Sequence, residues 1–105
     1  MTEIDKDNFD ELVINSGALT LVDYFGDACE PCKALLPHLE AMAGDYNGKV
    51  NFYKFNTSKA RRLAIREKIL GLPTISIYHN GTKVKELTKE EATPDAIKAM
   101  VDSML

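Results

Sequence analysis

Tryptophan is absent from this chain of 105 residues, and cysteine and histidine occur twice each. No apolar run approaches the roughly 20 residues that a membrane-spanning helix needs, so we expect no membrane contact. The segment Met1–Asp5 has neither the basic start nor the apolar centre of a secretion signal. We therefore expect a cytoplasmic protein, in a compartment where structural disulfides are rare.

The charge pattern also excludes a class of partner. The net charge is -3, and no block of like charge interrupts the chain. A nucleic-acid-binding domain needs a basic stripe for the phosphate backbone, so we expect no nucleic acid as the main partner. Apolar residues make up 45% of the chain, which is typical of a soluble globular protein. We expect one domain over residues 1–105, acting as a monomer.

Apolar runs and alternating residues predict four strands. They lie at 19–25, 50–55, 74–78 and 84–87. Asn80–Gly81, between the last two, is a strong hairpin signal, so those two strands are expected to be antiparallel. Helices between the earlier strands indicate parallel crossovers. The sequence thus predicts an α/β protein with a mixed sheet covered by helices on both faces.

Helical spacing of apolar residues predicts the helices that flank this sheet. They lie around 9–13, from 30 to about 48, over 59–68 and from Pro94 to about 104. We expect Asp7 or Asn8 to cap the first helix, and Thr93 to cap the last. Pro31 suits the first turn of the second helix.

Cys29 and Cys32 form a C-x-x-C pair at the predicted junction between a strand and a helix. Unpaired N–H groups and the macrodipole of the helix stabilise a thiolate at Cys29. Because the thiolate is the reactive form, Cys29 should be the nucleophile. Cys32 lies about one turn further on, within reach of the first sulfur. This arrangement indicates thiol–disulfide exchange.

The two cysteines have two alternative uses, a structural disulfide and a zinc site. A structural disulfide closing so short a loop would contribute little stability. Zinc normally takes four ligands, and only His38 and His79 could complete the set. The two histidines lie on different elements and do not converge easily with the cysteines. We therefore expect no metal and no other cofactor.

Several segments, in order along nearly the whole chain, resemble the thioredoxin family. They are Val22–Lys33 around the cysteines, Leu36–Pro37, Tyr53–Asn56, Gly71–Thr74 and Asn80–Gly81. The resemblance implies the thioredoxin fold, with a mixed five-stranded sheet of central parallel strands and an antiparallel hairpin, flanked by four helices. It also implies a Cys29–Cys32 disulfide, with Cys29 as the attacking thiolate and Cys32 as the resolving thiol.

The resemblance assigns Asp23 and Lys54 to the site as well. Asp23 matches a buried aspartate that acts through water as the base for Cys32, and Lys54 matches a lysine near it. The residues themselves support part of this, because burial in an apolar strand should raise the pKa of Asp23. The alternatives are an aspartate pointing outward and an ordinary solvated lysine.

The resemblance also implies a substrate-binding surface. Pro73 would follow a cis peptide bond that brings the backbone of Leu72 against the sulfurs, where a bound substrate pairs as an added strand. A trans proline that merely opens a strand is the alternative. Ala28, Glu30 and Pro31, next to Cys29, complete the expected surface.

The sequence departs from the family pattern around this surface. Phe25 and Ala28 stand where tryptophans are usual, and Glu30 stands in place of a glycine. The late glycine of the substrate groove is not recognisable, and Thr88–Ala92 occupies its region. We expect these changes to affect the choice of partner and to leave the core chemistry intact.

The expected function is reduction of disulfides in cytoplasmic proteins. The resemblance implies an electron carrier that a thioredoxin reductase reduces and that serves acceptors such as peroxiredoxins or reductases. A thiol oxidase or isomerase of the same fold would call for export and a more oxidising motif, often with histidine between the cysteines. A redox-inactive binding module would not need Cys29, Cys32, Asp23 and Pro73 together.

Overall fold

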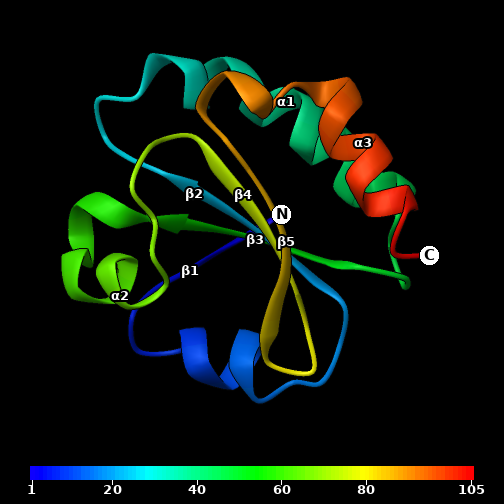
Figure 1. The fold of residues 1–105 in the computed structure, drawn as a ribbon, viewed down its shortest axis with the longest axis horizontal. Helices are drawn as coiled ribbons and strands as arrows, with labels where there is room; N and C mark the ends of the chain where they lie inside the picture. The colour runs from blue at the N-terminus through cyan, green and yellow to red at the C-terminus, as the bar shows by residue number, and fades with distance from the viewer.

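A five-stranded mixed sheet runs through the middle of the computed structural model, which describes residues 1–105 (Figure 1). Its strands are β1 (Thr2–Ile4), β2 (Thr20–Phe25), β3 (Asn51–Asn56), β4 (Thr74–His79) and β5 (Thr82–Thr88). Their spatial order is β1-β3-β2-β4-β5. β3 is parallel to β1 and β2, whereas β4 is antiparallel to β2 and β5. The predicted mixed sheet with an antiparallel hairpin is confirmed.

Four helical segments flank the sheet. They are η1 (Asp10–Ile14, a π-helical segment), α1 (Glu30–Asp45), α2 (Arg61–Arg66) and α3 (Pro94–Asp102). α1 and α3 cover one face, and η1 and α2 cover the other (Figure 1). Short 3₁₀ turns, η2 (Thr57–Lys59) and η3 (Lys89–Glu91), precede α2 and α3. None of the helices has the length and apolar character needed to cross a membrane.

Alternation along β2 divides its side chains between two cores, since successive residues of a strand point to opposite faces. Leu21 joins the core beneath α1 and α3, whereas Val22 and Tyr24 join the core beside η1 and α2. The same alternation places Asp23 on the face of Leu21. A carboxyl group therefore lies in the apolar layer under α1, and it is 2% exposed.

Two details of the predicted elements differ in the structure. The predicted helix at 59–68 is shorter, because the non-helical backbone of Ala60, at φ −154° and ψ 63°, separates η2 from α2. Strand β1 was not located from the sequence. It has three residues and a single buried side chain, Ile4, which is too little for any periodicity to appear.

The cap expected for the first helix was wrong. Neither Asp7 nor Asn8 caps η1, whose N-cap residue is Phe9 with no side-chain cap, and the side chain of Asp5 closes the turn before it. Asp5 Oδ1 accepts from the backbone N–H of Asp7 at 2.8 Å and of Asn8 at 3.2 Å. Asn8 Oδ1 accepts in return from the backbone N–H of Asp5 at 2.8 Å. This reciprocal pair resembles a capping box, shifted by two to three residues.

The hairpin turn gives a prediction about stability. Gly81 has φ +78°, and a Cβ there would overlap the backbone carbonyl of Ile14. Gly81→Ala should therefore lower the free energy of unfolding by ~1–3 kcal/mol in urea melts. Gly44→Ala is the control, because residue 44 is helical and its Cβ would meet nothing within 4 Å. That change should raise stability by ~0.5–1 kcal/mol. Equal effects of the two substitutions would contradict the conclusion that the turn requires glycine at position 81.

Candidate active site

Cys29 is the residue that caps α1, and the chain leaves β2 only a few residues before it. Its extended backbone, at φ −93° and ψ 98°, turns the chain into the helix, and its Sγ accepts from the backbone N–H of Cys32 at 3.2 Å. The two sulfurs are joined by a disulfide. Cys29 is partly exposed at the surface, whereas Cys32 is 4% exposed. One sulfur therefore faces solvent and the other is shielded.

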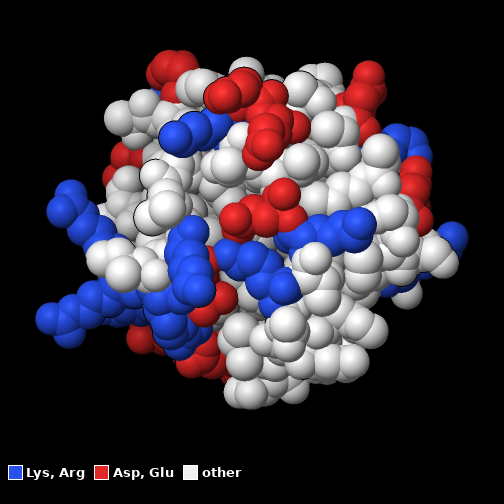
Figure 2. Space-filling view, viewed as in Figure 1, with Lys and Arg blue, Asp and Glu red and all other residues white.

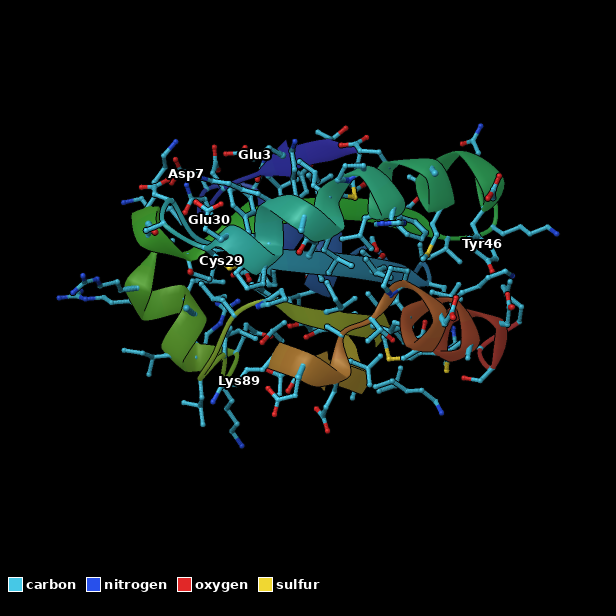
Figure 3. The ribbon with its side chains drawn as sticks, turned by 90° about the horizontal axis from the view of Figure 1, so that it is seen from above. Glu3, Asp7, Cys29, Glu30, Tyr46 and Lys89 are labelled. Atoms are coloured by element: carbon cyan, nitrogen blue, oxygen red, sulfur yellow. A yellow bond between two sulfur atoms is a disulfide. The ribbon has the colours of Figure 1, made fainter.

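The residues beside Cys29 that the sequence assigned to substrate binding lie at the surface. Ala28, Glu30 and Pro31 are all exposed. Glu30 forms an ion pair with Lys33 at 3.2 Å, one turn along the helix. Figure 3 shows Cys29 and Glu30 together at the start of α1. The carboxylate of Glu30 thus lies at the surface, on the residue next to Cys29.

Asp23 lies in the sheet beneath α1, and it is not the outward-pointing aspartate considered above. Its Oδ1 atom is fully buried and makes no hydrogen bond to another protein group. Burial, which penalises the charged form, raises the pKa of Asp23 to about 7. The Lys54 ammonium opposes this rise, and the Glu40 carboxylate adds to it. Asp23 can therefore take up or release a proton near neutral pH.

Lys54 lies directly across from Asp23, because the parallel register of β2 and β3 pairs the two residues. Its side chain is 23% exposed, so it is not an ordinary solvated lysine. Its Nζ atom is 3.9 Å from Oε1 of Glu40 on α1. Glu40 was missed from the sequence. It lies eight positions after Cys32 on the helix, and no pattern marks it as a neighbour of β3.

The loop before Cys29 is tied to the end of β3. Asn56 Nδ2 donates to Asp27 Oδ1 at 2.8 Å, and the backbone N–H of Asp27 donates to Ser58 Oγ at 3.1 Å. Thr57 Oγ1 donates to the carbonyl of Phe25 at 3.0 Å. These long-range hydrogen bonds hold the loop in place. The position of Cys29 therefore depends on the end of β3 as well as on β2, from which its own segment continues.

The Leu72–Pro73 peptide bond is cis, the geometry expected from the sequence. Thr74 Oγ1 donates to the carbonyl of Gly71 at 2.6 Å, and the Pro73 carbonyl accepts from the backbone N–H of Lys89 at 2.7 Å. Pro73 is buried and Leu72 is half-buried. A groove of about 350 Å³ runs past Pro73, Pro31 and Lys89. The structure thus brings the proline loop to the same surface as the start of α1.

A second cavity lies on the other side of the redox pair. It has a volume of about 230 Å³, and Cys32, Lys54 and Phe25 are among the residues that line it. Cys32 and Lys54 thus line the same cavity. Away from this site, no three His, Cys, Asp or Glu side chains come together as a metal site would require. His38 and His79 are both exposed.

Comparison with known proteins agrees with this geometry. The thioredoxin family model matches residues 1–103. The thioredoxin of Peptoclostridium acidaminophilum is 57% identical over 101 residues, covering 96% of this chain and 92% of that protein. The thioredoxin of Acetoanaerobium sticklandii is 52% identical, covering 96% of each chain. The chain belongs to the thioredoxin family.

A solved structure supports the same assignment of fold. Plasmodium falciparum thioredoxin superposes with a TM-score of 0.91 at 27% sequence identity, with full coverage of both chains. The fold of this thioredoxin family member is therefore the thioredoxin fold. Its cysteine pair forms a disulfide, so the chain is a thiol–disulfide oxidoreductase. Thioredoxins as a family are reduced by thioredoxin reductase and act on disulfide substrates.

The different exposure of the two sulfurs gives the next prediction. In the reduced protein, iodoacetamide should alkylate Cys29 at least tenfold faster than Cys32. Cys29 is accessible at the helix start, where a thiolate is stabilised, and Cys32 is shielded inside the helix. Peptide mass mapping after short labelling times measures both rates. Equal rates, or faster loss of Cys32, would contradict this assignment of the two thiols.

The buried carboxyl group makes stability depend on pH. The pKa of Asp23 is near 4 in the unfolded chain and about 7 in the folded protein. Burial of the charge therefore destabilises the fold progressively from pH 4 to pH 7, and by a constant amount above that range. Asp23→Asn should remove this penalty, so its advantage over the natural protein should grow to ~2–4 kcal/mol by pH 8.

Urea melts of the oxidised proteins at several pH values test this expectation, because the cysteines do not titrate in the disulfide. The stability difference between Asp23→Asn and the natural protein should be smallest at pH 4. It should rise to a plateau near pH 8. A difference that stays the same at every pH would show that Asp23 titrates as it does in the unfolded chain.

Proposed function

We propose that this protein reduces disulfides in cytoplasmic acceptor proteins and is itself reduced by a thioredoxin reductase. The observation that carries the proposal is the asymmetry of the cysteine pair. One sulfur lies at the surface on a helix N-terminus, and the other lies behind it with a buried carboxyl group in the sheet below. An exposed nucleophile with a shielded resolving thiol suits transfer of two electrons to a protein disulfide.

In the first step, the Cys29 thiolate attacks one sulfur of the acceptor disulfide. A new S–S bond joins Cys29 to the acceptor, and the acceptor's other sulfur leaves as a thiolate that takes a proton. In the second step, Cys32 loses its proton and attacks Cys29. The intramolecular disulfide forms, and the acceptor departs with both sulfurs reduced. Two electrons have passed from the protein to its substrate.

Asp23 is proposed as the base that takes the proton of Cys32 through water. Two features support this role. Its pKa of about 7 allows it to accept a proton at neutral pH. The cavity beside Cys32 is also lined by Lys54, the cross-strand neighbour of Asp23. Lys54 would stabilise the charged form of Asp23 and so adjust the pH at which the proton moves.

Leu72 and Pro73 are proposed to hold the acceptor. With Pro73 buried in the groove, the backbone of Leu72 is available to pair with an extended segment, which would add to the protein as a strand. Ala28, Glu30 and Pro31 would contact the same segment from the side of α1. No further cofactor takes part in this scheme, because the reductase supplies the electrons.

Trapping of the intermediate tests the proposal. Cys32→Ser should accumulate mixed disulfides with proteins of a cytoplasmic extract, because the second step is blocked. Cys29→Ser is the control and should trap none, since its remaining thiol is shielded. The complexes should disappear on treatment with dithiothreitol. The reduction potential should lie near the value of about −270 mV typical of thioredoxin. A value near that of strong oxidases, about −120 mV, would contradict a reducing role.

A further inference from the structure

A strongly basic segment contrasts with the acidic chain that contains it. Residues 59–68 carry five cations, although the net charge of the protein is -3. Arg66 is paired with Asp10 and Glu67. The other cations on α2 and the turn before it take part in no ion pair and are exposed: Lys59, Arg61 and Arg62. Figure 2 shows Lys and Arg atoms gathered over α2, with Asp and Glu atoms over α1 and the start of α3.

Apolar side chains are unusually exposed beside these cations. Leu70 is 92% exposed and Ile65 is 73% exposed, the highest values among the large apolar residues. Together with Leu72 they line a groove of about 410 Å³. Arg61 lines this groove as well as a neighbouring one of about 390 Å³, which Lys59 and Arg62 share. We call this combined surface, made of Ile65, Leu70, Leu72, Lys59, Arg61 and Arg62, the α2 face.

The α2 face is continuous with the redox site. Leu72 directly precedes Pro73, and it packs so closely on Gly26 that a Cβ at residue 26 would lie 2.9 Å from Leu72 Cδ1. Gly71 is covered by the side chain of Lys89, which would overlap a Cβ there. Lys89 therefore adds a cation at the border between the proline loop and the α2 face (Figure 3).

These observations point to one kind of occupant. We propose that the α2 face is a docking surface for acceptor proteins whose disulfide is flanked by acidic side chains and an apolar residue. The proposal rests on the reducing function above, and it adds the class of acceptor. The unpaired cations favour acidic groups, and the exposed apolar groove favours burial of an apolar side chain. Its contact with the loop before Cys29, made by Leu72 on Gly26, favours a redox partner over a nucleic acid.

A set of small disulfide peptides tests the proposal without an identified acceptor. The peptides share one cystine loop and differ in the flanking residues, which are all Glu, all Lys or all Gln. Single-turnover reduction by the dithiothreitol-reduced protein gives a second-order rate constant for each. The Glu peptide should be reduced about tenfold faster than the Lys peptide at low salt. The difference should largely vanish at about 0.5 M NaCl, where exposed charges are screened.

The net charge of the protein predicts the opposite order, which makes this measurement decisive. A faster reaction of the Lys peptide, or equal rates at low salt, would overturn the proposal. Reduction of the neutral Gln peptide reports on the proposed function separately. If the Gln peptide is reduced and the charged peptides show no preference, the protein is a reductase with no docking surface for acidic acceptors.

Matched variants locate the effect on the α2 face. Arg61→Gln/Arg62→Gln should lower the ratio of the Glu to the Lys rate constant by about threefold or more. The control Lys49→Gln/Lys85→Gln removes the same charge from exposed positions elsewhere and should leave the ratio unchanged. Equal effects of the two variants would show that only the overall charge matters, and that would overturn the assignment to this face.

The apolar part of the face has its own control. With a peptide that carries leucine beside its cysteine, Leu70→Ser should slow reduction by about threefold or more, since an apolar contact is lost. Val84→Ser changes another exposed apolar residue, 43% exposed on β5, and should have no effect. Thermal melts confirm that each variant is folded. An unchanged rate for Leu70→Ser would remove the apolar groove from the proposal.

Discussion

The hydrogen bond from the backbone N–H of Cys32 to Cys29 Sγ fixes the relative position of the two cysteines, on which the site depends. It makes Cys29 the cap of α1, so the sulfur sits where the free N–H groups of the helix stabilise negative charge. The same helical geometry places Cys32 one turn inside, close enough for a disulfide and shielded from solvent. Reactivity at one sulfur and protection of the other therefore follow from a single helix start.

The sheet supplies the second half of the site. Helices cover both faces of the sheet, and Asp23 on the central strand β2 is 2% exposed. The resulting desolvation raises the pKa of Asp23 and destabilises the fold at neutral pH. Lys54 and Glu40 act on it with opposite sign from two different elements. The protein thus keeps an energetically unfavourable buried carboxyl group in its sheet, a feature that often marks functional sites.

The pattern of the sequence predicted most of the secondary structure and the cysteine chemistry, for local reasons. The strands around Leu21 and Ile75, the Asn80–Gly81 turn and the Thr93 cap depend on neighbouring residues, and all are present in the structure. The prediction that failed, the cap of the first helix, also has a physical reason. The sequence pattern could not show that the side chain of Asp5 would accept from the N–H groups of Asp7 and Asn8 and leave η1 without a side-chain cap.

What the sequence by itself determined is the reactive pair, because C-x-x-C at a helix start is local geometry. The tertiary structure alone decided what surrounds that pair. Glu40 meets Lys54 only because α1 packs over β3, and the α2 face borders the loop that leads to Cys29 only because Leu72 packs on Gly26. Such contacts join segments far apart in the chain through burial and shape. No spacing along the sequence encodes them, since they depend on the packing of the whole sheet and its helices.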